Sequence, residues 1–491
     1  MTGIALDTFS APHRPVLSGA HGAVAAAHPL AVSAGLSLLE RGGTAADAAI
    51  AAQAVLAVVA PEACGIGGDV FALCGGGPTP VAVNGSGPAP RAAERAAGDG
   101  GASVAVPGLV PGWEAMQEAA GRLGLAACLA PAIRLAEEGM RPDPSLLRAR
   151  DAQSERLRAG GAGTWALLAA GPGDVWRQPE LAQVLREIAA SGAAALQHGD
   201  RAGQIAAACR AHGGAMTPED LAGAAAPRAA PLAAEVFGAR VSVQPPVSQG
   251  VLLLMALAAL ERAAPGPEGR DHAAVELTQA AFRHRDAVSR GAALLEVPLD
   301  HDPGRARRLG GPRSYLHTAG VAAADAAGGL VSSLVSVFDD FGSGVFVPEA
   351  GFVLNNRLGG FTAGDNAFAP GKRPVHTLAP VLVERDGATV ALATPGADGQ
   401  VQTLLQVLID WLVRERDLAA SVAAPRWRSE DRRLLIEAGH PAAEALAAKG
   451  HEVVALAPGD MRFGAVCAAG QVAGRPVALA DWRRTTWAGA T

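Results

Sequence analysis

The stretch Val331-Ser-Ser-Leu-Val-Ser-Val-Phe338 marks the point where the texture of this chain changes. Its β-branched residues are typical of a strand. Similar short pieces, several of them separated by glycine-containing turns, follow at residues 344–347, 352–354, 379–384 and 389–393. A helix is predicted next, over residues 400–416. The second part of the chain is therefore expected to be rich in strands.

The first part of the chain instead favours helices. Thr44 and Asp47 form a capping-box-like start to an Ala/Val/Leu run that Pro61 ends, which predicts a buried helix up to about Val59. Further helical patterns lie at residues 131–170, 250–263 and 271–290. Helices first and strands second predict an α+β fold, with a helix-rich N-terminal part and a strand-rich C-terminal part that share one core.

Composition excludes several functional classes. The chain has 491 residues, 18% of them charged, and a net charge of −6, which argues against a nucleic-acid partner. Apolar runs at residues 48–60 and 251–260 are too short to span a membrane. Residues 1–22 lack a basic region followed by an apolar core, so we expect a cytoplasmic protein without a secretory signal.

Metal and nucleotide chemistry also receive little support. The five cysteines include no C-x-x-C pair, and the twelve histidines show no ligand spacing, so no metal site is predicted. Cys64-Gly-Ile-Gly-Gly-Asp69 lacks the ending of a phosphate loop and follows a helix, so a tight turn is the better interpretation.

A second glycine-containing stretch, Thr394-Pro-Gly-Ala-Asp-Gly-Gln-Val-Gln402, precedes the predicted helix at residues 400–416. Free N–H groups at such a place can form an oxyanion hole, although these residues taken alone favour a bare turn.

An ordered succession of blocks then becomes recognisable. The blocks are His28–Ile50, Pro61–Gly68, Ser103–Trp113, Pro245–Gly250, Phe341-Gly-Ser-Gly344, Leu354-Asn-Asn-Arg357, Arg373–Pro380, Pro425-Arg-Trp427 and Ala480-Asp-Trp-Arg-Arg484. Together they resemble the γ-glutamyltranspeptidase (γ-glutamyltransferase) family over almost the whole chain.

This resemblance implies an N-terminal nucleophile (Ntn) hydrolase with a four-layer αββα sandwich. It also implies a precursor that cuts itself into a large and a small subunit, without a metal or organic cofactor. The first residue of the small subunit is then a threonine, whose newly freed α-amino group can serve as the base because its pKa is about 7.7–8.0.

The family places its threonine seven residues before an aspartate in a D-x-x-G-x-x-V-S motif. Asp325-Ala-Ala-Gly-Gly-Leu-Val-Ser332 matches this motif, which places the nucleophile at Thr318. Cleavage is then expected between His317 and Thr318, giving a large subunit of residues 1–317 and a small subunit of residues 318–491.

Further roles come from the resemblance position by position. Ser336 matches a second hydroxyl that contacts the nucleophile, and Gly396 and Ala397 match the pair that forms the oxyanion hole. Asn356 lies beside the pocket, while His376 and Thr377 match two residues that line the acyl pocket.

Departures from the family bear on the substrate. Ala319 and Gly320 follow the nucleophile where typical members have Thr-His. The acidic residue that binds the substrate ammonium falls on Gly360 and its polar neighbour on Arg357, and the arginine that binds the carboxylate falls near Ser86. Both charge contacts for a glutamyl head group are thus missing, and Arg357 with His376 favours an anionic acyl group.

The leading hypothesis is a self-processing threonine amidohydrolase or acylase, possessing some acyltransferase capacity, that acts on a small amide. One alternative is γ-glutamyl transfer or hydrolysis on glutathione-like donors. The other is a catalytically silent homologue that serves as a binding subunit. The partners expected are the amide substrate and the two subunits of the precursor. The sequence leaves the oligomeric state open, a homo-oligomer included.

Overall fold

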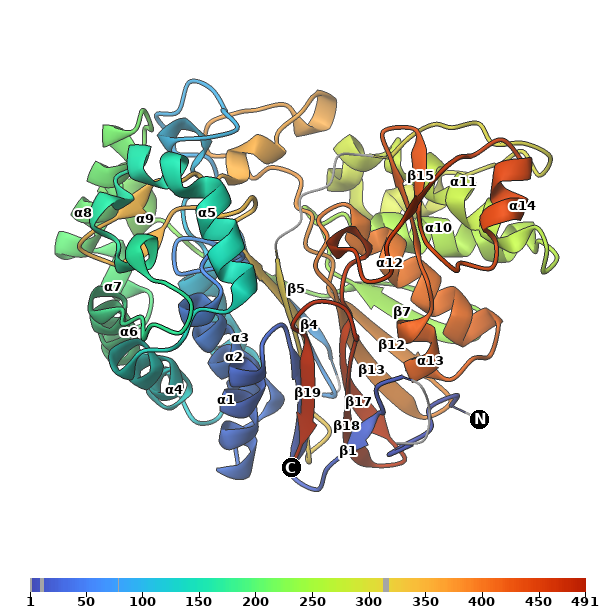
Figure 1. Ribbon diagram of the computed structural model, residues 1–491, viewed down its shortest axis with the longest axis horizontal. Helices are drawn as coiled ribbons and strands as arrows, with labels where there is room; N and C mark the ends of the chain where they lie inside the picture. Colours follow the sequence, from blue (N-terminus) through green and yellow to red (C-terminus); the bar gives the residue numbers. More distant parts are fainter. Residues whose placement is uncertain (1, 9–12, 78, 312–317) are drawn as a thin grey trace.

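Two seven-stranded sheets form the centre of the computed structural model, which describes residues 2–8, 13–77, 79–311 and 318–491 (Figure 1). In the first sheet the order is β19 (Trp487–Ala490), β2 (Gly22–Ala26), β8 (Ala319–Asp325), β9 (Leu330–Ser336), β3 (Asp69–Gly75), β4 (Val81–Gly85) and β5 (Arg228–Ala229). In the second sheet it is β1 (Leu17–Ser18), β18 (Arg475–Ala480), β17 (Cys467–Val472), β13 (Ala388–Ala393), β12 (Val381–Arg385), β7 (Ala239–Val243) and β6 (Leu232–Val236).

The alternation of side chains explains how the two sheets meet. On β2, Val24 and Ala26 pack against helices, whereas Ala23 and Ala25 join a core shared with the second sheet. Most members of that inter-sheet core are small, including Ala322, Ala391 and Ala469 on the facing strands, and Leu73, Leu330 and Leu382 are the larger ones.

Helices cover the outer face of each sheet (Figure 1). The first sheet packs against α1 (Pro29–Glu40), α2 (Ala45–Val59) and α3 (Leu109–Ala120), among others. The second packs against α10 (Gly250–Ala263), α11 (Arg270–Phe282) and α12 (Gly399–Leu408). The helix predicted from Thr44 and Asp47 is confirmed, with its capping box formed and all of α2 buried.

The remaining elements extend these layers. The first helical layer continues through α4 (Leu125–Glu138), α5 (Pro144–Ala159), α6 (Pro179–Ser191), α7 (Ala194–Gln197), α8 (Gly199–Ala211) and α9 (Pro218–Ala222). Later in the chain come α13 (Leu418–Ala423), α14 (Ala443–Ala448), the hairpin of β10 (Phe346–Val347) and β11 (Phe352–Val353), and a small sheet of β14 (Trp427–Glu430), β15 (Arg433–Glu437) and β16 (Glu452–Leu456).

The expected order holds, with most helices before residue 318 and most strands after it, but the N-terminal part also contributes strands that the sequence pattern missed. Among them, β2 pairs with β8, β3 pairs with β9, and β4 pairs with β3. Their alanine and glycine content hid them, because small residues carry a weak strand signal. Two predicted helices also end early: α11 stops at Phe282 before a 3₁₀ segment, and α12 stops at Leu408 before one π-helical turn.

The glycines of Cys64–Asp69 allow backbones to approach closely, as the tight-turn interpretation predicted. A Cβ atom added at Gly67 would lie 2.2 Å from the Val353 carbonyl oxygen, and one at Gly68 would lie 2.3 Å from that of Ser336. These contacts press the start of β3 against the end of β9.

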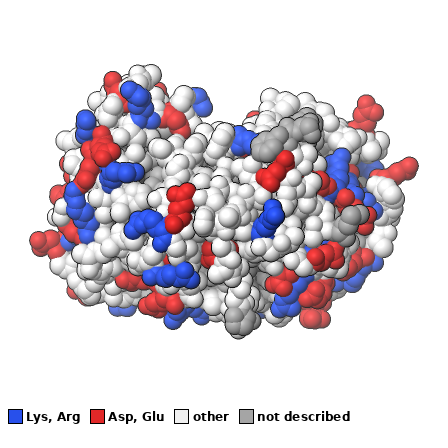
Figure 2. Space-filling view, turned by 90° about the horizontal axis from the view of Figure 1, so that it is seen from below, with Lys and Arg blue, Asp and Glu red and all other residues white. Residues whose placement is uncertain are grey.

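Two surface observations complete the description. Within the described ranges, no helix has the length and apolarity needed to cross a membrane. On the face seen in Figure 2, acidic and basic side chains are interspersed.

Candidate active site

Four polar residues lie in one row across four neighbouring strands of the first sheet. Ala319 pairs with Val335, so Thr318, just before β8, stands opposite Ser336 at the end of β9. Ser336 pairs with Asp69 on β3, and the pairing of Val70 with Gly85 places Ser86 opposite Asp69. Residues directly opposite in antiparallel strands point to the same face, so these four side chains share one side of the sheet.

That side is the one facing the second sheet. On β8, Ala322 belongs to the inter-sheet core, and Thr318 has the same parity. On β3, Leu73 belongs to that core, and Phe71 packs against Ala393 of the second sheet. Asp69 lies an even number of residues from both, so its side chain points to the same face of the sheet. The row therefore opens toward the second sheet.

The first two members of the row are in contact. Thr318 is 5% exposed, and its Oγ1 lies 3.4 Å from the Ser336 Oγ. The Ser336 hydroxyl also accepts a hydrogen bond from the Phe338 N–H at 2.9 Å. Phe338 has a φ of +86°, a strained value for an aromatic residue of the kind found at functional sites. His317, on the other side of the expected cleavage bond, lies outside the described residues.

The turn at Gly396 and Ala397 lies beside Thr318. The Ser332 hydroxyl donates to the Leu392 carbonyl, and a Cβ atom at Gly320 would lie 3.4 Å from the backbone of Ala393. Thr318 lies two residues before Gly320, and the turn begins directly after Ala393, the last residue of β13. Thr318 therefore comes next to the start of this turn.

The polarity of the turn suits an anionic oxygen. Its carbonyls are occupied, because Gly396 O accepts from the Gly399 N–H at 2.8 Å and Ala397 O accepts from Gln249 Nε2 at 3.0 Å. The Gly396 and Ala397 N–H groups donate to no residue in the described part of the chain, and both residues have positive φ, +126° and +49°. Two unpaired backbone donors at a helix start can bind an oxyanion.

Gln249 joins this turn to the predicted acyl-pocket residues, a role that sequence reasoning missed. Its Nε2 also donates to the Thr377 carbonyl at 2.8 Å, and its backbone N–H donates to the His376 carbonyl at 3.0 Å. The side chain is fully buried. Its only sequence signal was its place in the Pro245–Gly250 block.

Asp69 is the second residue that sequence reasoning missed, because its segment was interpreted only as a turn. Its carboxylate accepts from Arg357 Nε at 2.7 Å and from Arg357 Nη2 at 3.0 Å. His376 Nε2 lies 3.0 Å from the same carboxylate, without the alignment of a good hydrogen bond. All three side chains are at most 2% exposed.

The protonation states follow from these contacts. Burial alone would raise the pKa of Asp69, but Arg357 and His376 outweigh it and lower that pKa. Burial, helped by the Arg357 charge, lowers the pKa of His376 to about 4. His376 Nδ1 accepts from the Leu378 N–H at 3.2 Å, which assigns the proton of the neutral ring to Nε2, facing Asp69.

These contacts correct one expectation. Arg357 and His376 were expected to favour an anionic acyl group, but both already face a carboxylate of the protein itself. Arg357 also lies over the ring of Phe338, with its guanidinium carbon 4.4 Å from the ring centroid.

The other sequence candidates have mainly local contacts. Asn356 Nδ2 donates to Asp339 Oδ2 at 2.7 Å and to the Gly98 carbonyl at 2.9 Å, so it fixes the loop after β9. The Ser86 hydroxyl donates to Asn84 Oδ1 at 2.6 Å, and the Ser86 carbonyl accepts from Arg373 Nε at 2.8 Å. The guanidinium of Arg373 is thus engaged by backbone carbonyls, because its Nη2 also donates to the Ala225 carbonyl at 3.1 Å.

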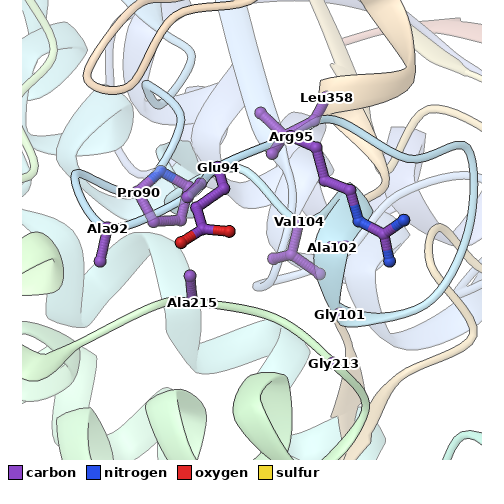
Figure 3. Close-up of a pocket in the computed structure, with 11 residues that line it drawn as sticks. Pro90, Ala92, Glu94, Arg95, Gly101, Ala102, Val104, Gly213, Ala215 and Leu358 are labelled. Atoms are coloured by element: carbon purple, nitrogen blue, oxygen red, sulfur yellow. The ribbon is translucent and has the colours of Figure 1, made fainter.

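A separate cavity of about 170 Å³ lies behind the Arg357 loop (Figure 3). Leu358 forms one wall, and Pro90, Glu94, Val104 and Ala215 are among its other lining residues. None of the residues of the row lines it. The part of the chain that the structure describes holds no group of three His, Cys, Asp or Glu residues arranged for a metal ion.

Comparison with known proteins identifies the family. The family model described as gamma-glutamyltranspeptidase matches residues 31–302 and 311–491, so the chain belongs to this family. Among its relatives, the oxamate amidohydrolase proenzyme of Klebsiella pneumoniae is 32% identical over 447 residues, 83% of this chain and 85% of the relative. The acylase ACY 1 proenzyme of Pseudomonas sp. (strain SE83) is 30% identical over 501 residues, 91% of this chain and 89% of the relative.

Solved structures agree with this grouping. The crystal structure of a cephalosporin acylase from Bacillus halodurans matches with a TM-score of 0.85 and 28% identity. The match covers 99% of both chains. The mixed α/β fold is therefore that of the acylases in this family.

Proposed function

We propose that this protein is a self-processing threonine amidohydrolase with the four-layer αββα sandwich of an Ntn hydrolase. The observation that carries the proposal is the row of Thr318 and Ser336, which meets the unpaired N–H groups of Gly396 and Ala397 across the two sheets. The names of the relatives, which are proenzymes of amidohydrolases and acylases, support the same chemistry.

The mechanism follows from these groups. Cleavage of the 317–318 bond frees the Thr318 α-amino group, which accepts the proton of the Thr318 hydroxyl as Oγ1 attacks the amide carbonyl. The Gly396 and Ala397 N–H groups stabilise the oxyanion, and the Ser336 hydroxyl keeps Oγ1 oriented. The protonated amine then delivers a proton to the leaving amine, and water releases the acid from the acyl-enzyme.

The substrate we propose is an amide of a small acid without an α-ammonium group. Gly360 offers no carboxylate to bind an ammonium, and an unpaired charge in a desolvated pocket is costly. A γ-glutamyl anilide is expected to be a poorer substrate than anilides of simple acids such as glutaric acid or an oxo-acid. A clear preference in kcat/KM for the γ-glutamyl compound would favour true γ-glutamyl transfer instead.

Intact mass after expression tests the proposal. We expect two associated chains, with the smaller one beginning Thr-Ala-Gly-Val. A chain that stays whole after prolonged incubation at neutral pH, and turns over no amide, would favour the silent homologue.

A further inference from the structure

The trio of Asp69, Arg357 and His376 lies next to both halves of the proposed catalytic machinery. Asp69 is two strands from Thr318 in the same row, roughly 10 Å at the usual strand spacing. Arg357 packs on Phe338, whose N–H holds Ser336. His376 precedes Thr377, which Gln249 ties to the oxyanion turn. An acyl group on Thr318 that followed this row along the sheet would approach the trio.

The trio carries no net charge. Asp69 is held as a carboxylate by the bidentate guanidinium of Arg357, and the imidazole of His376 is neutral. The pair is fully buried, so solvent does little to screen either charge. A second carboxylate brought against Arg357 would therefore meet the Asp69 carboxylate as well.

One nitrogen of Arg357 is unused. Arg357 directs Nε and Nη2 to Asp69, whereas its Nη1 is buried and has no hydrogen-bond partner among the described residues. A buried N–H group without a protein partner is uncommon and calls for an acceptor from a ligand or from water. An uncharged oxygen meets this need without the repulsion that a carboxylate would meet.

We propose that Asp69 is a specificity-determining residue that neutralises Arg357, so that the site selects acyl groups with an uncharged hydrogen-bond acceptor and discriminates against carboxylates. This inference rests on the proposed amidohydrolase function and names its substrate class. Asp69 acts through Arg357 and is a positioning residue, whereas Arg357 Nη1 contacts the acyl group.

Two isosteric substrates test the inference. The first is glutaryl p-nitroanilide, which carries a terminal carboxylate. The second is the analogue with a terminal carboxamide in place of that carboxylate, which is neutral and almost the same size. For the wild-type enzyme we expect kcat/KM to be at least about 10-fold higher for the carboxamide. In Asp69→Asn the Arg357 charge is uncompensated, so the ratio should shift toward the carboxylate by about 10-fold or more, a change that a merely structural role would not produce.

Two further variants keep the test decisive. If Asp69→Asn gives no soluble, processed protein, Arg357→Gln reverses the imbalance and leaves Asp69 unpaired. The test uses the ratio of kcat/KM for a 5-aminopentanoyl anilide, which has a terminal ammonium, to kcat/KM for the glutaryl anilide. This ratio should be about 10-fold higher in Arg357→Gln than in the wild type. Arg373→Gln is the matched control, because Arg373 is the other guanidinium near the row and should leave the carboxamide-to-carboxylate ratio unchanged.

The outcomes separate the two proposals. A wild-type enzyme that hydrolyses none of these anilides or related small amides would count against the amidohydrolase function itself. Turnover with no preference for the carboxamide, or a charge ratio that Asp69→Asn leaves unchanged, would overturn only the role of Asp69. A shift in Arg373→Gln would assign the charge preference to Arg373 instead.

Discussion

Two buried arginines in this molecule, Arg483 and Arg357, differ in how completely their nitrogens are paired. In the cluster around Asp481, that carboxylate accepts from Arg426 at 2.6 Å and from Arg483 at 2.9 Å. Arg483 also binds Glu437 and the carbonyls of Val422 and Ala424, so all three of its nitrogens are engaged. In the trio beside Thr318, Arg357 keeps one nitrogen without a partner.

Position separates the two clusters more clearly than pairing does. The Asp481 cluster joins the segment after β18 to β15 and to the segment before β14, and Arg426 Nε in it also has no partner among the described residues. The Asp69 cluster lies in the row of Thr318, where an unpaired donor suits a place where a ligand binds. Both clusters arise from family-like sequence blocks, so the resemblance alone does not distinguish them.

The largest effect is expected at Thr318, the proposed nucleophile of the site. Thr318→Ala should abolish both self-cleavage and turnover, a loss of at least about 10⁴-fold, because alanine lacks the oxygen that both steps use. Denaturing gels and a progress curve with an anilide measure the two losses. Thr318→Ser, which keeps a hydroxyl, is the control and should retain slow processing. Cleavage at the same bond in Thr318→Ala would place the nucleophile elsewhere.

A change in the Asp481 cluster should act on stability instead. Asp481→Asn leaves Arg426 without its carboxylate and Arg483 with that of Glu437 alone, and breaking a buried pair typically costs about 3–5 kcal/mol. We expect a lower denaturant midpoint, with the carboxamide-to-carboxylate preference unchanged in the fraction that folds. An altered preference would remove the proposed distinction between the clusters.

The pH dependence of His376 sharpens the comparison further. Burial lowers the pKa of His376 to about 4, whereas an unfolded histidine titrates near 6.5. As the pH falls below about 6.5, His376 takes up a proton in the unfolded state but not in the folded state. Its contribution to the unfolding free energy, complete above this pH, is therefore lost toward pH 4.

Between pH 7 and pH 5 the wild type should therefore lose about 2 kcal/mol more unfolding free energy than His376→Asn. Urea unfolding of both proteins at both pH values measures this difference. Glu62, whose pKa burial raises to about 8, contributes with the opposite sign but equally in both proteins, and therefore cancels. Parallel pH profiles would mean that His376 is already charged in the folded state.

The smallest effect is expected at the oxyanion turn. Ala397 has a φ of +49°, a conformation that glycine adopts more easily, and the proposed role uses only its N–H group. Ala397→Gly should change the unfolding free energy by less than about 1 kcal/mol and kcat/KM by less than about threefold. Thermal unfolding and anilide kinetics measure both quantities. A large loss of activity would mean that the Ala397 methyl group itself contacts the substrate.

Local signals in the sequence were sufficient for part of this structure. The capping residues of α2 and the bounds of α10 could be predicted because they depend on nearby residues. Thr318 and Ser336 could be matched because their spacing to Asp325 fixes the register of one hairpin.

The long-range contacts could not be predicted in this way. The pairing of Asp69 with Arg357 joins residues 288 positions apart, and the role of Gln249 depends on contacts with two distant loops. The sequence shows the positive charge of Arg357, but only the folded structure shows that the Asp69 carboxylate neutralises it.

The alanine-lined space between the two sheets sets a tolerance for the whole machine. Thr318 precedes β8 of one sheet and the Gly396–Ala397 turn follows β13 of the other, so the distance between them depends on the side chains packed between the sheets, many of them alanines. A bulkier residue at Ala322 or Ala469 would separate the proposed attacking oxygen from the proposed oxyanion donors without touching either. Sites far from the chemistry thus control its alignment through volume alone.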